Sequence, residues 1–306
     1  MVNYYRNKNK PDFTKSEDTN MKNTKKLLAA LLAMTMALSL AACGKKQEAT
    51  APVPSPAPAP TETTQPAAPE EDSDLAKIQE KGTLVVGITE FEPMDYQDSD
   101  GNWIGFDADM AAAFAESLGV AVEFQIIDWD NKVMELNSGM IDAVWNGMTL
   151  TDEVTSAMEC SNAYCNNAQV VIVPVDMADQ YQDVDSISAL NFAVEVGSAG
   201  KDEVEALGAA YTEVADQATA LLEVSSGTSD AAVIDSLMAA AMVGEGTSYA
   251  NLTYTVGLNS EEYGVGFRKG SDLAAALNDF FKTAYADGSM IACAETYGVQ
   301  AALIAQ

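Results

Sequence analysis

Residues 120–145 read VAVEFQIIDWDNKVMELNSGMIDAVW. The segment 120–127 predicts a strand, 131–138 predicts a helix that ends near Gly139, and 142–145 predicts a second strand that runs into a Gly-Met-Thr loop. A strand, a helix and a strand in succession form a βαβ unit, which is typical of parallel sheets. This stretch therefore indicates an α/β protein.

The same alternation continues on both sides of this stretch. Toward the N-terminus, 83–88 predicts a buried strand and 107–118 an amphipathic helix that ends at Gly119. Toward the C-terminus, we expect strands at 169–173, 192–196, 211–214, 231–234 and 262–267, and helices at 201–207, 217–225, 236–243, 271–287 (with Ser271 as N-cap) and 289–297. Two βαβ systems with largely parallel sheets follow from this order.

The N-terminal part has the composition of an export signal. Residues 21–26 carry three lysines, and the apolar run 27–42 has 16 residues, fewer than the roughly 20 that span a membrane. The run ends in Leu40-Ala-Ala-Cys43-Gly44, which resembles a bacterial lipobox, whose cysteine is acylated; an ordinary cleavage site beside a chance cysteine is the alternative. We predict a lipoprotein signal peptide at 21–42, lipidation of Cys43, and a non-native or misassigned extension at 1–20.

Residues 43–74 are predicted to be a lipid anchor and linker. Pro, Ala and Thr alternate over 51–69, a composition that favours extended polyproline II and cannot pack a core. The predicted location is the extracellular face of the cell membrane, where the folded domain is held on this stalk by the acylated cysteine.

Charge and residue inventory exclude several functions. The formal net charge is −30; seven of the 16 Lys and Arg and three of the 46 Asp and Glu precede Cys43, so 9 against 43 remain, or −34. Nucleic-acid binding is excluded by this charge. The chain has no histidine, which rules out Ser-His-Asp triads, His-based zinc sites and imidazole acid–base chemistry. We expect no cofactor and no metal.

Three cysteines follow Cys43: Cys160, Cys165 and Cys293. An exported protein can form disulfides, and Cys160 and Cys165 could close a small loop. Free, partly buried thiols are the equal alternative.

An ordered set of motifs resembles the polar amino-acid binding proteins of ABC importers, family-three solute-binding proteins, over about 78–298. The motifs are Leu84-Val-Val-Gly87, Pro93-Met-Asp-Tyr96, Gly105-Phe-Asp-Ala-Asp-Met110, Trp129-Asp130, Ser138-Gly-Met-Ile-Asp-Ala143, Asn146-Gly-Met-Thr-Leu-Thr151, Gly197-Ser-Ala-Gly200, Asp230-Ala-Ala-Val-Ile-Asp235 and Glu262-Tyr-Gly264.

The resemblance implies a two-lobed periplasmic-binding-protein-like fold of type II, with two α/β lobes joined by a two-strand hinge near 168–171 and 253–256. Lobe 1 would be 75–169 plus 256–306 and lobe 2 would be 170–255. The implied function is capture of an amino acid or related amine-bearing solute in an interlobe cleft, without catalysis. The implied partners are an ABC permease and ATPase complex and the membrane, reached through the lipid anchor, with the binding protein itself a monomer.

The resemblance also assigns the binding residues. Asp235 follows the strand 231–234 directly and matches the aspartate that holds the ligand ammonium, although a helix N-cap is the alternative reading. Thr149 and the Gly147 backbone match the rest of the ammonium site, and Ser198 with Ala199 would offer a helix N-terminus to a carboxylate. The full predicted set is Phe91, Tyr96, Trp129, Asn146, Gly147, Met148, Thr149, Ser198, Ala199 and Asp235, in which the aromatic residues could equally be core packing.

One departure from the family pattern puts the ligand class in doubt. The family's Thr-x-x-Arg, whose arginine grips the ligand carboxylate, reads Thr151-Asp-Glu-Val154 here. Lys132 is the nearest replacement, although a solvated helix lysine is the better expectation, and Arg268 is expected at an exposed strand end.

Two other functions remain open from the sequence. One is a dehydratase-like enzyme on the same fold, with Glu90, Glu92, Asp95 and Glu195 supplying cleft carboxylates. The other is a lipoprotein that senses a ligand and signals to a receptor.

Overall fold

A computed structural model describes residues 73–306. The predicted extension at 1–20, the signal peptide at 21–42, Cys43 and nearly all of the 43–74 linker lie outside the described residues. Among those described, no helix combines the length and apolar character needed to cross a bilayer.

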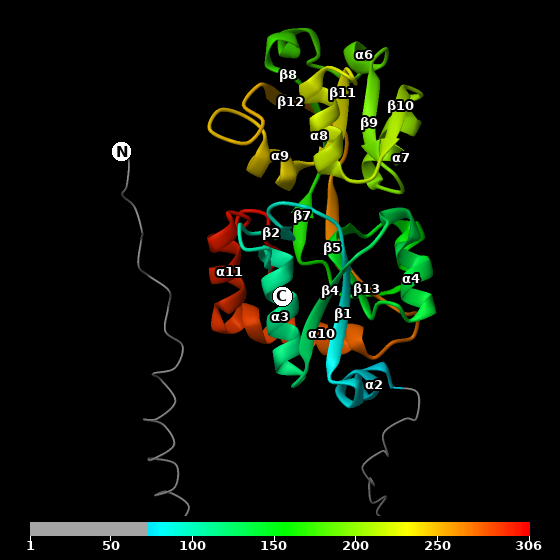
Figure 1. The fold of residues 1–306 in the computed structure, drawn as a ribbon, viewed down its shortest axis with the longest axis vertical. Coiled ribbons are helices and arrows are strands. Elements are labelled where there is room, and N and C mark those ends of the chain that lie inside the picture. The colour runs from blue at the N-terminus through cyan, green and yellow to red at the C-terminus, as the bar shows by residue number, and fades with distance from the viewer. Residues whose placement is uncertain (1–72) are drawn as a thin grey trace, which may run out of the picture. The chain divides into compact units, whose positions relative to one another are not determined.

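The first lobe, built from both ends of the described chain, holds a mixed sheet in the order β4-β1-β5-β13-β6, with β7 also paired to β13. Figure 1 shows α3 and α11 on one side of the strands and α4 on the other, and α10 contacts α3, α11 and β13. The elements are α2 (Asp74–Lys81), β1 (Thr83–Ile88), β2 (Tyr96–Gln97), β3 (Trp103–Ile104), α3 (Phe106–Ser117), β4 (Ala121–Ile126), a 3-10 turn η1 (Trp129–Asn131), α4 (Lys132–Ser138), β5 (Ala143–Thr149), α5 (Asp152–Ala157), β6 (Glu159–Cys160), β7 (Cys165–Asn167), β13 (Glu261–Phe267), α10 (Leu273–Asp287) and α11 (Ser289–Tyr297).

The second lobe holds a five-stranded sheet in the order β10-β9-β11-β8-β12. Its elements are β8 (Gln169–Pro174), η2 (Val175–Gln180), α6 (Val184–Ile187), β9 (Asn191–Glu195), α7 (Ala199–Leu207), β10 (Ala210–Val214), α8 (Gln217–Ser226), β11 (Ala231–Asp235), α9 (Ser236–Met242) and β12 (Leu252–Gly257). The chain enters this lobe between β7 and β8 and leaves it between β12 and β13. Gln169 and the residues up to Gly257 therefore pair within this second sheet, and Gln169 is counted with lobe 2 below. The fold is thus two-lobed and α/β, as the sequence predicted.

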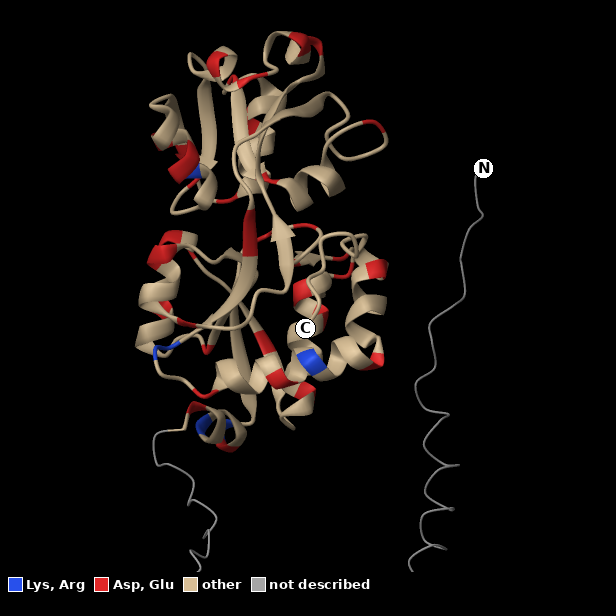
Figure 2. Cartoon of the chain, turned by 180° about the vertical axis from the view of Figure 1, so that it is seen from behind, with Lys and Arg blue, Asp and Glu red and all other residues tan. Residues whose placement is uncertain are grey.

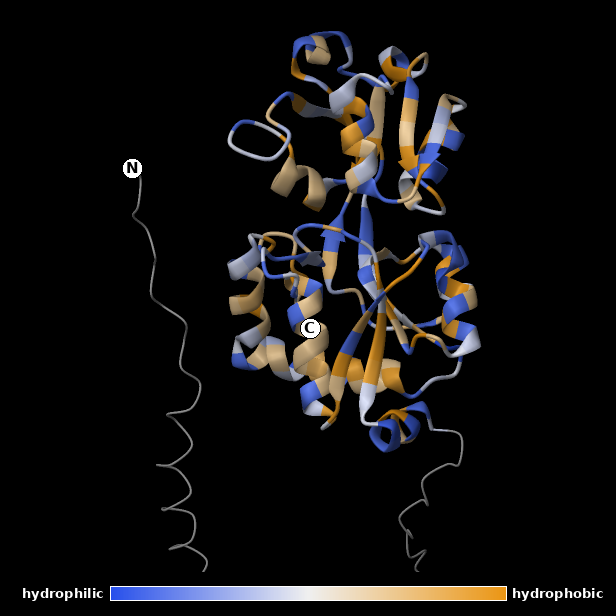
Figure 3. Cartoon of the chain, viewed as in Figure 1, coloured by the Kyte–Doolittle hydropathy of each residue, from blue (hydrophilic) through white to orange (hydrophobic). Residues whose placement is uncertain are grey.

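Apolar strands form the centre of each lobe, as the hydropathy colouring in Figure 3 shows. In the first lobe Trp145 packs edge-on against Phe281 with ring centroids 5.6 Å apart, and Tyr164 lies 5.7 Å from the same ring. In the second lobe β8, β9 and β11 contribute buried Val, Phe and Ala side chains to one cluster. Parallel pairing of β1 with β4 and β5, and of β9 with β10 and β11, places the carboxyl ends of these strands at the edge of each sheet that faces the other lobe.

The segment 147–149, expected as a loop, is the end of strand β5. Antiparallel pairing supplies its backbone partners, with Tyr263 opposite Thr149 and Gly264 opposite Met148. The pairing slips between Gly264 and Gly266. A distant strand therefore determines this local structure, which periodicity in the segment itself does not reveal.

The expected N-cap of α10 is wrong, and of the two alternatives for Cys160 and Cys165 the structure shows the free thiols. Asp272, not Ser271, precedes α10, and it makes no side-chain cap. Cys160 and Cys165 are free thiols. Their partners on β13 are Gly266 and Tyr263, three residues apart, which corresponds to about 10 Å of strand. A disulfide requires Cα atoms within about 7 Å.

Arg268 does not occupy an exposed strand end. Its guanidinium pairs with Asp74 at 3.1 Å and with Asp142 at 3.4 Å, and it donates to the carbonyl of Ile141 at 2.9 Å. Arg268 thus joins the first helix of the described chain to the loop before β5. It lies in none of the pocket walls described below.

Candidate functional site

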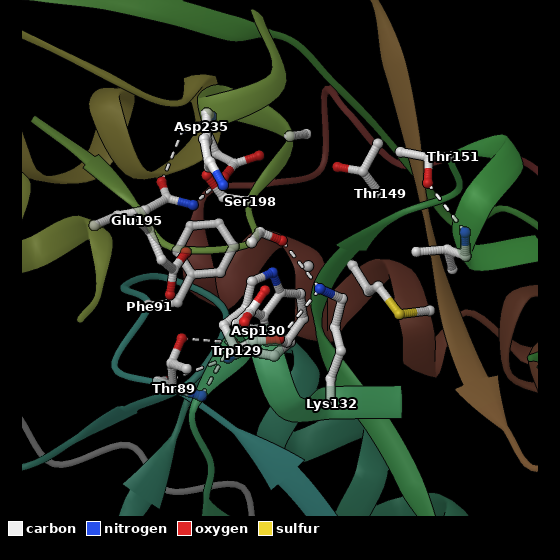
Figure 4. A pocket seen from close by; sticks show the side chains of 18 of the residues that line it. Thr89, Phe91, Trp129, Asp130, Lys132, Thr149, Thr151, Glu195, Ser198 and Asp235 are labelled. Carbon is white, nitrogen blue, oxygen red and sulfur yellow. Dashed lines mark hydrogen bonds between the residues drawn. The ribbon is translucent and has the colours of Figure 1, made fainter. Parts of the chain in front are cut away.

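A cavity of about 220 Å³ lies where the two lobes face each other. Both lobes line it (Figure 4). Lobe 1 contributes Thr89, Glu90, Phe91, Trp129, Asp130, Lys132, Val133, Asn146, Gly147, Met148, Thr149, Thr151, Glu153 and Val154, and lobe 2 contributes Gln169, Glu195, Gly197, Ser198, Ala199, Lys201, Asp202, Gln217 and Asp235. Nine of the ten predicted site residues are among them.

Asp235 ends β11 and is only 4% exposed. Its Oδ1 accepts hydrogen bonds from Tyr263 Oη at 2.7 Å, from Gln169 Nε2 at 2.9 Å and from Asn167 Nδ2, while Gln217 Nε2 donates to Oδ2. All four donors are neutral. Although Asp235 precedes α9, its side chain makes no cap hydrogen bond. Burial, followed by the nearby Glu261 carboxylate, raises the pKa of Asp235 to about 7.

Glu195 ends β9, the parallel neighbour of β11, and is 3% exposed. Its Oε1 is buried without a hydrogen-bond partner among residues 73–306. Burial raises the pKa of Glu195 to about 8, and the Asp235 and Asp216 carboxylates add to this effect. The sequence offered Glu195 only as an enzyme carboxylate. Its position at the end of a strand parallel to β11 is the signal that could have placed it beside Asp235.

Lys132 is part of the pocket and is not a solvated helix residue. Its Nζ donates to the carbonyl of Trp129 at 3.1 Å and to the carbonyl of Gly197, in the other lobe, at 3.0 Å. The same nitrogen lies 4.8 Å from the centroid of the Trp129 ring, within the range of a cation–π contact. Burial lowers the pKa of Lys132, and the Glu195 carboxylate opposes this shift.

The lobes touch closely at Gly197. This glycine has φ +68°, and a Cβ built on it would lie 2.7 Å from Asp130 Oδ1 in lobe 1. Only glycine fits this approach without a shift of its neighbour. Ser198 follows, and its hydroxyl accepts from Lys201 N at 3.1 Å, so it caps α7. The Ser198 and Ala199 backbone forms the pocket wall beside this cap.

The β5 residues are held by partners within the protein. Thr149 Oγ1 donates to Glu261 Oε1 at 2.9 Å, and Gly147 N donates to Asp107 Oδ2 at 2.7 Å. Asn146 accepts from the Thr89 hydroxyl at 2.8 Å and donates to Asp95 at 2.8 Å. These bonds fix β5 as a rigid wall of the pocket.

The aromatic residues divide into two groups. Phe91 and Trp129 line the pocket, and Phe91 packs edge-on to Tyr263 with centroids 6.3 Å apart. Tyr96 does not line it; its ring packs against Tyr297 of α11, 6.5 Å away. Tyr96 therefore belongs to the packing of lobe 1 against its C-terminal helix.

Of the carboxylates considered for an enzyme, Glu90 and Glu195 line the pocket and Glu92 and Asp95 do not. Asp95 is fully buried behind Asn146, and burial together with Asp107 raises its pKa well above the ordinary value. Within residues 73–306 there is no group of three His, Cys, Asp or Glu side chains arranged to hold a metal ion.

Two α/β lobes with a polar pocket between them define the class of two-lobed binding proteins. The family model for bacterial extracellular solute-binding proteins, family 3, matches residues 84–300. The chain therefore belongs to that family.

Individual relatives agree with this assignment. A probable histidine-binding protein of Neisseria gonorrhoeae is 30% identical, over 84% of this chain and 89% of its own length. The L-cystine-binding protein TcyJ of Escherichia coli (strain K12) is 27% identical, over 73% of this chain and 85% of its own. The crystal structure of an ancestral amino acid-binding protein, described as a precursor of cyclohexadienyl dehydratase, superposes with a TM-score of 0.68 at 31% identity and covers 74% of this chain and 99% of that one.

Proposed function

We propose that this protein captures an amino acid or related amine-bearing solute in the pocket between its lobes and delivers it to an ABC permease and ATPase complex. The observation that carries the proposal is Asp235. A carboxylate that is 4% exposed, on the wall of a cavity, with no cation within ion-pair distance among the described residues, is suited to an ammonium group supplied by a ligand.

The relatives support the same reading. Their names give histidine, cystine and amino acids as ligands. A cavity of about 220 Å³ is smaller than the roughly 300–1,000 Å³ of pockets for drug-sized molecules and suits a small solute. Closure of two lobes around the solute requires ligand contacts that form in only one state, and the pocket walls come from both lobes.

Calorimetric titration with a panel of amino acids, amines and dipeptides tests this function. We expect one ligand per protein with the ligand recovered unchanged, and a rise in melting temperature on binding. Conversion of the ligand during incubation would instead support an enzyme, for which Glu195, with its raised pKa, is the residue suited to general acid–base work.

We further propose that Cys43 carries the lipid that holds the protein at the outer face of the membrane, because a charged and then apolar segment precedes Leu40-Ala-Ala-Cys43. Cys43→Ser is expected to move the protein from the membrane fraction to the soluble fraction. Cys293→Ser, a change at a half-buried thiol of α11, serves as the control and should stay with the membrane. If both variants stayed with the membrane fraction equally, the proposed lipid anchor at Cys43 would be wrong.

A further inference from the structure

We propose that the pocket selects a solute with net positive charge and no free carboxylate, such as an α,ω-diamine. This inference rests on the proposed function, because it names the class of solute that the same pocket holds.

The wall of the pocket is strongly acidic. Six carboxylate side chains and two lysines line it, and the carboxylates are Glu90, Asp130, Glu153, Glu195, Asp202 and Asp235. A cavity lined by one sign of charge concentrates ions of the opposite sign. In Figure 2 acidic residues are common on both lobes and basic residues are few.

Neither lysine is available as the main holder of a ligand carboxylate. Lys201 Nζ lies 2.9 Å from Glu213 and 3.8 Å from Glu205, so it is paired outside the cavity. Lys132 Nζ donates two of its three N–H groups to the carbonyls of Trp129 and Gly197, and it lies over the Trp129 ring. These contacts leave one N–H of Lys132 for a ligand, and they hold the ammonium group against the protein wall.

Neither of the two deepest carboxylates forms an ion pair among the described residues, although the charge of Lys132 opposes the rise in the pKa of Glu195. Asp235 accepts only from neutral donors, and Glu195 has an oxygen that is buried and unpartnered among the described residues. Because β9 and β11 are parallel neighbours, both acids lie at the same sheet edge (Figure 4). A buried unpaired carboxylate is unfavourable unless it takes up a proton or a cation joins it. A solute with two amines can satisfy both acids.

The part of the wall that α5 forms offers little to an anion. Val154, 7% exposed and at the pocket wall, presents only methyl groups. Its amide N–H donates to Thr151 Oγ1 at 3.1 Å, and Glu153 beside it also lines the cavity. A ligand carboxylate placed there would meet an apolar side chain and a like charge, which disfavours it.

Two pairs of solutes that differ by one carboxylate test the inference. We expect 1,5-diaminopentane to bind at least about tenfold more tightly than L-lysine, and agmatine to exceed L-arginine similarly, because each amine lacks the group that the acidic wall repels. Isothermal titration at pH 7.5 measures both ratios.

The outcomes separate this inference from the proposed function. Tighter binding of lysine or arginine, or binding confined to other carboxylate-bearing solutes, overturns the inference and leaves the proposed function intact. Absence of binding to every member of the wider panel would contradict the proposed function itself.

Glu195→Gln tests the residue that distinguishes this pocket. Removing the charge should lower the affinity for 1,5-diaminopentane by about tenfold and the affinity for L-lysine by less. The ratio of the two affinities should therefore fall. Glu245→Gln, an exposed change in the same lobe, is the matched control and should leave both affinities unchanged. If Glu195 were only structural, its variant would shift the melting temperature without changing the ratio, and an unchanged ratio would exclude it from ligand selection.

Discussion

Asp235→Asn is expected to lower solute affinity by about a hundredfold or more while the protein remains folded. Removing one partner of a buried ion pair costs about 3–5 kcal/mol, and each 1.4 kcal/mol is a factor of ten in affinity. Asp235 is 4% exposed, so water does not screen its attraction for an ammonium group.

The hydrogen bonds around Asp235 explain why the Asp235→Asn variant should still fold. Three of its donors, including Gln169 Nε2 and Tyr263 Oη, converge on Oδ1, which asparagine retains. The new Nδ2 would face Gln217 Nε2, and this single mismatch costs about 1–3 kcal/mol. The loss of a buried charge offsets part of that cost.

Thermal melts with and without ligand separate the two effects. The variant should melt cooperatively near the wild-type temperature and show no ligand-induced rise. Asp176→Asn, which removes one exposed charge from the same lobe, is the matched control and should bind normally. If Asp235→Asn bound the solute with wild-type affinity, Asp235 would not be a ligand-binding residue.

The alternating strands and helices were predictable because their residues are local and strongly patterned. Helix α11 (Ser289–Tyr297) has the predicted bounds, since a glycine precedes it and Gly298 ends it. The family assignment and the two-lobed α/β fold were also correct. Short strands such as β6 and β7 were missed because they exist only through pairing with β13.

The contacts within the candidate site were less predictable. The bond from Lys132 to the Gly197 carbonyl joins residues 65 positions apart, so no spacing in the sequence indicates it. Arg268 was expected in solvent because a strand end suggests exposure, yet two distant aspartates pair with it. The unpartnered oxygen of Glu195 is likewise a property of the assembled pocket and not of any motif.

Folding stability is expected to fall as pH rises from 5 to 8. Burial raises the pKa of Asp107 and of Asp235 to about 7 and that of Glu195 to about 8, against 3.8 for aspartate and 4.5 for glutamate in the unfolded chain. Between these limits the native state binds more protons than the unfolded state, so the free energy of unfolding decreases with pH.

Each pKa unit corresponds to about 1.4 kcal/mol for one group. Relaxation around the buried acids makes the total effect smaller than the sum of the contributions of the three groups. We expect the free energy of unfolding to fall by about 3 kcal/mol between pH 5 and pH 8. For a domain of this size such a loss lowers the melting temperature by about 6–12 °C. Melts across this range measure the effect, and Asp235→Asn should flatten the curve because it removes one of the titrating groups.

Repulsion between the exposed acidic residues also lowers stability as pH rises. Measurements at different salt concentrations distinguish this surface repulsion from the titration of the buried acids. At 1 M salt the Debye length is about 3 Å, which screens exposed charges but leaves the fully buried acids largely unaffected. The pH dependence should therefore persist at high salt, and its disappearance would assign it to the surface instead. A cationic solute should raise the melting temperature more at pH 8 than at pH 5, because at pH 5 it must displace protons from Glu195 and Asp235.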